Sequence, residues 1–359
     1  MDGTSVESTA GIILVGTYPS NITTFDRLLP RPLLPVAHKP LFSYAVSWLR
    51  QAGIRDVAIC SNHWTQALQA HLARHAPDGD ELSYYEEAMP RGAAGSVRDA
   101  AWRSDAENFV VTDGTAVPTV ELGELLASHR ASGAAATVVV HAERPRRGQR
   151  SFLVPCGIYV FARRALDLVA PRGFCDIKEK LIPRLYQAGE KVSVHAATGA
   201  TARVLDAGTY LAVNEWMVEQ LVEAAEPDDG YVGSGSVLAH RSAQISAGAV
   251  FVGPVLVGPG ARVMAGATVV GPTSIGLEAT VGRGALVSRT AVWRRSVVGD
   301  EAVADRCIVA DDAVVEPCTR AFGVVKTRAR QPHPEPMAGG RAGFADLFPS
   351  VPVKKPAIS

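Results

Sequence analysis

The sequence contains five cysteines, whose thiols can ligate a metal or form disulfides. They are scattered along the chain and form no C-x-x-C pair; they are Cys60, Cys156, Cys175, Cys307 and Cys318. A zinc site or a disulfide framework requires closer and more regular spacing. We therefore expect buried or idle thiols in a reducing compartment.

A second group of candidate residues follows short apolar runs in the first half of the chain. The run from Gly11 to Val15 ends at Gly16, and a long loop comes next. Val57–Cys60 is a second apolar run, and helical spacing of apolar residues predicts helices over 41–49 and 64–73. Strands that alternate with helices indicate a mostly parallel sheet, which binds ligands at the C-terminal ends of its strands.

Composition limits the classes of function. The 359 residues suggest two domains, and the 47% apolar content is too high for general disorder. A net charge of zero gives no electrostatic reason to expect a nucleic-acid partner. The first apolar run is too short for a signal peptide or a membrane span. We expect a cytoplasmic protein without a membrane partner.

The second half contains a repeat of six residues. Every sixth residue is apolar over nine repeats: Ile245, Phe251, Val257, Val263, Val269, Ile275, Val281, Val287 and Trp293. The fourth residue after each of the first eight is small: Ala249, Val255, Ala261, Ala267, Thr273, Ala279, Ala285 and Ala291. An antiparallel sandwich does not have this period. The pattern predicts a left-handed parallel β-helix with about three coils in this run.

The ends of the repeat are less regular. Its start is blurred over 232–243, and Val298-Gly299 arrives one residue early. Many hexapeptide proteins are acyltransferases that use a histidine, but His240 is the only histidine in this region and lies in the blurred part. A structural role is therefore the better interpretation, with a homo-oligomer formed through the β-helix.

Several motifs of the first half resemble one family and occur in the family's order. Pro30–Val36, followed by Lys39-Pro40-Leu41, resembles the P-K-P-L-L-P-V…K-P-L segment of sugar-1-phosphate nucleotidylyltransferases, or NDP-sugar pyrophosphorylases. Further segments resemble the motifs that follow in this family: Glu87–Gly95, Phe109–Thr115, Gly157–Phe161 and Leu205–Asn214. A β-helix after the first domain is also a habit of the family. The GDP-mannose and glucose-1-phosphate branches look most similar.

The resemblance implies a fold and a reaction. The fold is α/β, a Rossmann-like, mostly parallel sheet followed by the β-helix. In the reaction, a sugar-1-phosphate oxygen attacks the α-phosphorus of a nucleoside triphosphate and pyrophosphate leaves, with Mg²⁺ held by carboxylates. Family positions with catalytic roles correspond to Arg31 and Asp206. Those expected to bind the nucleotide sugar are Gly16, Glu87, Gly92, Ala94, Gly95, Gly114 and Gly157. A plain strand-to-helix turn is the alternative role of the segment from Glu87 to Gly95.

The phosphate-binding loop departs from the family pattern G-G-x-G-T-R-L. Thr17 and Pro19 stand in place of glycines, and Asn21 stands in place of the arginine. Proline offers no N–H to a phosphate, and loss of a neutralising arginine costs on the order of 10³-fold in rate by analogy with arginine fingers. The lysine of P-K-P is Arg31, which keeps the charge but changes its geometry.

The residues at the expected metal site also differ from the family pattern. The family pairs two aspartates, and the second is present as Asp206, but the first aligns with Thr115. Asp113 lies two residues earlier, which in an extended strand places it roughly 6–7 Å away. Because Mg²⁺ needs oxygens at about 2.1 Å, we expect Asp113 not to replace the missing ligand.

Three functional hypotheses follow. The leading one is a catalytically impaired protein that binds a nucleotide sugar or sugar-1-phosphate and regulates or scaffolds a catalytic nucleotidyltransferase partner, with no cofactor. The alternative is an active, Mg²⁺-dependent enzyme that makes NDP-sugar precursors for polysaccharide or glycan synthesis. The third is the acyltransferase considered above. We expect a nucleotidyltransferase-like domain over 1–225, the β-helix over 232–325, and a proline-rich linker and tail over 326–359.

Overall fold

The computed structural model describes residues 8–16, 25–62, 82–87, 91–143, 152–197, 202–224 and 230–328. Three predicted features lie outside these residues: the altered phosphate-loop positions from Thr17 onward, the helix expected over 64–73, and the tail beyond Arg328. The side chain of Glu87 is also outside the described part.

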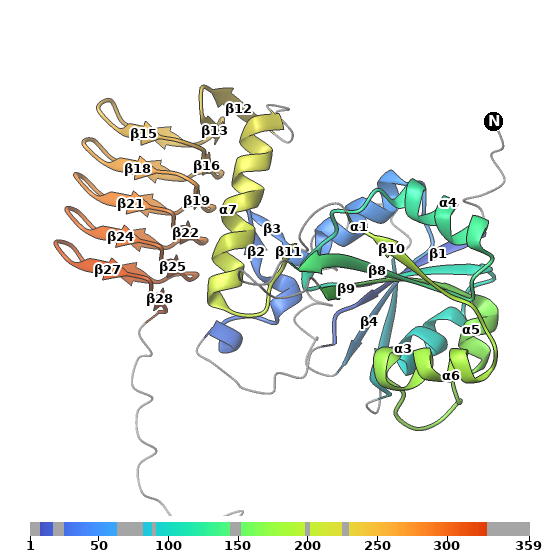
Figure 1. Ribbon diagram of the computed structural model, residues 1–359. Coiled ribbons are helices and arrows are strands. Elements are labelled where there is room, and N and C mark those ends of the chain that lie inside the picture. Colours follow the sequence, from blue (N-terminus) through green and yellow to red (C-terminus); the bar gives the residue numbers. More distant parts are fainter. Residues whose placement is uncertain are drawn as a thin grey trace, which may run out of the picture. The chain divides into compact units, whose positions relative to one another are not determined.

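A seven-stranded sheet forms the centre of the first domain, in the order β10-β8-β9-β6-β1-β4-β5 (Figure 1). Only β9 runs antiparallel to its neighbours β6 and β8. This confirms the mostly parallel sheet. Its strands are β1 (Thr9–Leu14), β4 (Val57–Asn62), β5 (Leu82–Glu87), β6 (Asn108–Asp113), β8 (Ala136–Glu143), β9 (Phe152–Ala162) and β10 (Val192–Ala196).

Helices cover both faces of this sheet because its strands are apolar on both sides. One face packs against α1 (Leu41–Gln51) and α4 (Leu122–Ser132). The other packs against α3, α5, a π-helical turn and α6, which span Gly92–Ala101, Arg163–Asp167, Ile177–Leu181 and Ile182–Gln187. The packing is close, since a Cβ added to Gly11 of β1 would lie 2.6 Å from Leu49 Cδ1 of α1.

Short elements follow the edge of the domain. The proline segment, residues 25–40, forms two 3₁₀ turns and a small hairpin, namely Phe25–Arg27, Arg31–Leu33, β2 (Pro35–Val36) and β3 (Lys39–Pro40). The hairpin turn places Ala37 and His38 at φ 43° and 71°. Burial lowers the pKa of His38 to about 4, so its imidazole is neutral at pH 7. A second ribbon pairs β7 (Ala116–Val117) with β11 (Ala202–Arg203).

The long helix α7 (Ala207–Ala224) leads to the β-helix. Its buried residues Tyr210, Val213 and Met217 share an apolar cluster with the proline segment and with the outer side of one β-helix sheet. No helix among the described residues has both the length and the apolar character that crossing a bilayer requires.

Three stacks of parallel strands make up the second half and confirm the parallel β-helix (Figure 1). One stack opens with β12 (Tyr231–Ser234), which is antiparallel to the next strand. It continues with β13 (Val237–His240), β16 (Val255–Val257), β19 (Thr273–Ile275), β22 (Ala291–Val292), β25 (Ile308–Val309) and β28 (Val325–Lys326). The second contains β14 (Gln244–Ile245), β17 (Arg262–Val263), β20 (Thr280–Val281), β23 (Val297–Val298) and β26 (Val314–Val315). The third contains β15 (Val250–Val252), β18 (Thr268–Val270), β21 (Leu286–Ser288), β24 (Val303–Asp305) and β27 (Arg320–Phe322). The blurred first residues and the irregular end therefore form coils too.

The length of a coil changes inside the β-helix. Thr268 pairs with Leu286, eighteen residues later, whereas Leu286 pairs with Val303, seventeen residues later. The residue is lost at one corner, where Arg289 at φ 45° stands instead of the Gly271-Pro272 pair of the coil before. This shift explains the early arrival of Val298-Gly299.

The shorter corner also corrects one predicted core position. The sixfold count places Trp293 inside the β-helix, but Val292 occupies the interior instead. Trp293 lies on the outer side, where its indole nitrogen donates to Tyr210 Oη at 2.7 Å. After the deletion the inward position falls one residue earlier, and the next side chain points the opposite way.

Candidate functional site

The C-terminal end of β6 is the structural centre of the candidate site. The last residue of β6, Asp113, pairs in register with Leu14 of β1, and a turn follows at once. Asp113 Oδ1 accepts hydrogen bonds from the Thr115 backbone nitrogen at 2.9 Å and from Thr115 Oγ1 at 2.8 Å. The expected extended spacing between these two residues is therefore wrong, because the strand ends at Asp113 and the chain folds back through a turn.

Arg203 is a site residue that the sequence analysis missed. Its guanidinium Nη2 forms an ion pair with Asp113 Oδ2, with 34% of the Arg203 side chain and 20% of the Asp113 side chain exposed. The β7–β11 ribbon sets Arg203 opposite Ala116, and the Val204 nitrogen donates to Thr115 O at 2.9 Å. No spacing pattern marks this arginine, and its place three residues before Asp206 is the only signal in the sequence.

Asp206 lies at the start of α7. Its Oδ1 accepts hydrogen bonds from the Thr209 backbone nitrogen at 2.8 Å and from Thr209 Oγ1 at 2.9 Å. These bonds lower the pKa of Asp206, and the positive charge of Arg31 lowers it further. The ribbon also brings the segments of Thr115 and Asp206 side by side.

The residues at this edge do not fit an Mg²⁺ site. Mg²⁺ requires oxygen ligands in near-octahedral geometry. A neutral Thr115 hydroxyl stands where a second carboxylate was expected, and the charge of Asp113 is already compensated by the Arg203 guanidinium. No group of three or more His, Cys, Asp or Glu residues in the described part of the chain is arranged to hold a metal.

The glycines near this edge have different surroundings. Gly16 is exposed directly after β1. Gly114 is buried, and a Cβ there would lie 2.7 Å from Val15 Cγ1, so close strand packing accounts for it. Gly157 on β9 has φ 79°, and its Cβ would lie 3.4 Å from Asp113 Cβ. Of these three glycines, Gly16 is exposed, whereas Gly114 and Gly157 are buried.

The backbone of Cys175 packs against the turn before α3 and occupies its N–H groups. The nitrogens of Ala94 and Gly95 donate to Cys175 O at 3.0 and 3.3 Å, and the Cys175 nitrogen donates to Arg91 O at 2.7 Å. Gly92 has φ 73°, and a Cβ there would lie 2.7 Å from Cys175 O. These contacts favour the structural-turn interpretation for Gly92, Ala94 and Gly95. Glu87 ends β5 nearby.

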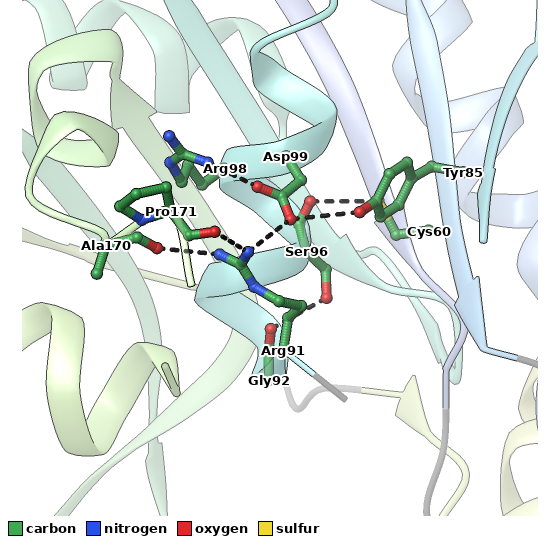
Figure 2. A network of polar contacts seen from close by, with 9 residues as sticks. All are labelled: Cys60, Tyr85, Arg91, Gly92, Ser96, Arg98, Asp99, Ala170 and Pro171. Carbon is green, nitrogen blue, oxygen red and sulfur yellow. Dashed lines mark hydrogen bonds and ion pairs between the residues drawn. The ribbon is translucent and has the colours of Figure 1, made fainter. Parts of the chain in front are cut away.

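Arg91 anchors the segment that closes this turn (Figure 2). Its guanidinium donates to Ala170 O at 3.0 Å and to Pro171 O, and it pairs with Asp99 at 3.3 Å. Asp99 also accepts from Arg98 at 2.8 Å and from Tyr85 Oη at 3.3 Å. The charge of Arg91 is therefore used inside the fold.

One cysteine lies beside a histidine, with Cys156 Sγ 3.6 Å from His141 Nδ1. None of the five cysteines forms a disulfide, and Cys318 is exposed whereas the other four are buried. His240 Nδ1 is 2.7 Å from Ser242 Oγ, and the ring lies against Gly230 and Tyr231. These are local contacts that stabilise the first coil.

Comparison with known proteins gives a consistent result. The nucleotidyl transferase family model matches residues 10–152. Mannose-1-phosphate guanyltransferases from Gibberella zeae and Yarrowia lipolytica are 25% and 26% identical, each covering 66% of this chain and 72% and 73% of their own length. Mannose-1-phosphate guanylyltransferase from Mycobacterium tuberculosis is 25% identical over 50% of this chain and 56% of its own.

Solved structures resemble the fold. The crystal structure of HddC from Yersinia pseudotuberculosis, complexed with GMP-PN, superposes with a TM-score of 0.50 at 12% sequence identity. The match covers 58% of this chain and 99% of HddC. At this identity the comparison supports the fold alone.

Proposed function

Since the chain belongs to the sugar-1-phosphate nucleotidylyltransferase family, we propose that it binds a nucleotide sugar without catalysing nucleotidyl transfer and serves as a regulatory or scaffolding subunit. The observation that carries this proposal is the Arg203–Asp113 ion pair beside Thr115. It occupies the edge of the sheet where the family's reaction needs a metal ion.

The chemistry explains why this pair matters. Nucleotidyl transfer depends mainly on positioning and on neutralising the charge that develops on the phosphates. Asp206 is one of the two carboxylates that the family uses. At the position of the other, this chain has Thr115, whose side chain is a neutral hydroxyl. Together with Pro19 and Asn21 in the phosphate loop, this leaves too few groups to stabilise the leaving pyrophosphate.

The bound ligand is proposed from the relatives. Those named above act on mannose-1-phosphate as guanyltransferases, so a GDP-sugar such as GDP-mannose is the favoured ligand. Among the described residues, we propose that Arg31 and the exposed Gly16 contact it. A catalytic family member is the favoured protein partner.

Turnover tests the loss of catalysis. Pyrophosphate release is measured with a panel of sugar-1-phosphates and nucleoside triphosphates in Mg²⁺, with the Mycobacterium tuberculosis guanylyltransferase as positive control. We expect no release above background. Turnover in the ordinary enzyme range of roughly 1–10³ s⁻¹ would contradict the proposal and support the alternative, an active enzyme that makes NDP-sugar precursors.

Calorimetry tests ligand binding. A triphosphate carries more negative charge than the diphosphate of a nucleotide sugar, and the altered loop neutralises charge poorly. We expect GDP-mannose to bind more tightly than GTP, with little dependence on Mg²⁺. Tighter, Mg²⁺-dependent binding of GTP is the contrary outcome. Arg31→Gln should weaken binding, while Arg164→Gln, which alters an exposed arginine paired with Glu190, serves as the matched control.

A further inference from the structure

We propose that Arg203 is a built-in cation that takes the place of a divalent metal at the end of β6. Its guanidinium would neutralise the diphosphate of a bound nucleotide sugar and leave the site without need of a metal. The proposal rests on the proposed ligand class, but its first test is independent of that ligand.

Backbone contacts hold Arg203 in this position. Arg203 pairs with Ala116 in the β7–β11 ribbon, and this pairing fixes the position of the Arg203 backbone. The bond from the Val204 nitrogen to Thr115 O, 2.9 Å long, ties the next residue to the turn that carries Asp113. The ion pair is therefore formed between two anchored segments, which lowers the entropy lost on forming it.

The Asp113 carboxylate is already paired with a cation. Its Oδ1 accepts two hydrogen bonds from Thr115, and its Oδ2 is engaged by Arg203 Nη2. A divalent ion would have to displace the guanidinium and then remain next to a second positive charge. The local arrangement therefore favours one cation, and Arg203 already supplies it.

The same guanidinium retains capacity for a phosphate. A third of the Arg203 side chain is exposed at the end of β6, where it pairs with Asp113. An arginine presents five N–H donors in a plane that matches phosphate oxygens. Nη2 is engaged by Asp113 and Nε is buried, so Nη1 is the donor group that the described contacts leave for a ligand. Arg31 near Asp206 adds a second positive charge to this edge.

A gain of metal binding tests the replacement directly. Mn²⁺ is titrated into the full chain and the free ion is followed by electron paramagnetic resonance. Wild type should bind none at this site, while Thr115→Asp combined with Arg203→Ser should restore two carboxylates without the competing cation. We expect Mn²⁺ to bind this double variant at least ~10-fold more tightly than it binds the control, Thr115→Asp combined with Arg164→Ser.

Two results of that titration would overturn the proposal. One is Mn²⁺ binding to wild type that Asp206→Asn abolishes. The other is equal affinity of the two double variants, which would show that Arg203 does not exclude the metal.

The role toward phosphate is tested by GDP-mannose binding in the presence of EDTA. Arg203→Ser should weaken binding about 10-fold or more, Arg203→Lys should restore part of it, and Arg164→Ser should leave it unchanged. Because Arg203→Ser leaves the Asp113 carboxylate unpaired and could unfold the edge, Asp113→Asn combined with Arg203→Ser is measured as well. Unchanged affinity in folded variants contradicts the proposal.

The two proposals fail in different experiments. Turnover by wild type refutes the non-catalytic function, whereas metal binding beside Arg203 refutes the built-in cation. If GDP-mannose does not bind at all, the ligand proposal falls while the Mn²⁺ titration still decides the role of Arg203 as a metal substitute.

Discussion

Asp113 and Thr115 illustrate how a spacing of two residues depends on local structure. In a strand they would share a face at a distance of roughly 6–7 Å. Here β6 ends at Asp113, and the turn brings the Thr115 hydroxyl to 2.8 Å from the carboxylate. The Asp113 carboxylate thus interacts with this hydroxyl and with Arg203, which is ninety residues away in the chain.

Gly92 gives a prediction at the same scale. Alanine at its φ of 73° is strained, and its Cβ would also lie 2.7 Å from Cys175 O. We expect Gly92→Ala to lower the free energy of unfolding by about 2–4 kcal/mol, measured by urea denaturation.

The matched control for this prediction is Gly133→Ala. Gly133 has φ 62° with no neighbour within 4 Å of an added Cβ, so strain alone should cost about 1 kcal/mol. Equal losses in the two variants would show that the contact with Cys175 is unimportant. Loss of ligand binding in a bulky Gly92 variant would therefore not identify a ligand contact.

At the scale of elements, α7 connects the site with the β-helix. It carries Asp206 just before its first turn and Asn214 in its middle. The buried Asn214 side chain accepts from the Ala37 nitrogen at 3.0 Å and donates to Ser274 Oγ at 3.1 Å. One side chain thus joins the proline segment, the helix and the β-helix. Tyr210 acts similarly, since its hydroxyl donates to Pro35 O at 2.5 Å and accepts from Trp293.

Replacement of Asn214 tests this connection. Asn214→Ala leaves the Ala37 N–H and the Ser274 hydroxyl without their partner in a buried place, at about 1–3 kcal/mol for each group. We expect a loss of about 2–5 kcal/mol in urea unfolding and weaker GDP-mannose binding, because α7 positions Asp206. Glu215→Ala, which removes an ion pair with the half-exposed Arg289, is the neighbouring control and should change less. A loss as large in the control would contradict the role of Asn214.

At the scale of the whole molecule, one sheet of the β-helix presents apolar side chains to solvent. They lie on the stack that contains β15, β21 and β27: Val250, Val252, Leu286 and Phe322, which are 49%, 52%, 37% and 57% exposed. Exposed apolar side chains gathered on one sheet are suited to association. The occupant that we favour is a second copy of the chain, as the sequence analysis expected.

Light scattering at micromolar concentration tests this association. We expect an oligomer for wild type and a smaller species for Leu286→Glu, because a charge buried in an apolar interface is unfavourable. Arg262→Glu on β17, an exposed position of the neighbouring stack, should leave the oligomer intact. A wild-type monomer, or dissociation by both variants, would contradict the prediction.

The sequence by itself determined the features that depend on local periodicity. The six-residue repeat predicts a β-helix because each position of the repeat has the same environment in every coil. The alternation of strands and helices predicts a mostly parallel sheet. Only the tertiary structure decided the features that join distant segments: the Arg203–Asp113 pair, the Asn214–Ser274 contact and the closure of α3 by Cys175. It also decided that Val292, and not Trp293, enters the core after a corner loses one residue. These contacts depend on where remote parts of the backbone meet, and local spacing carries no information about that.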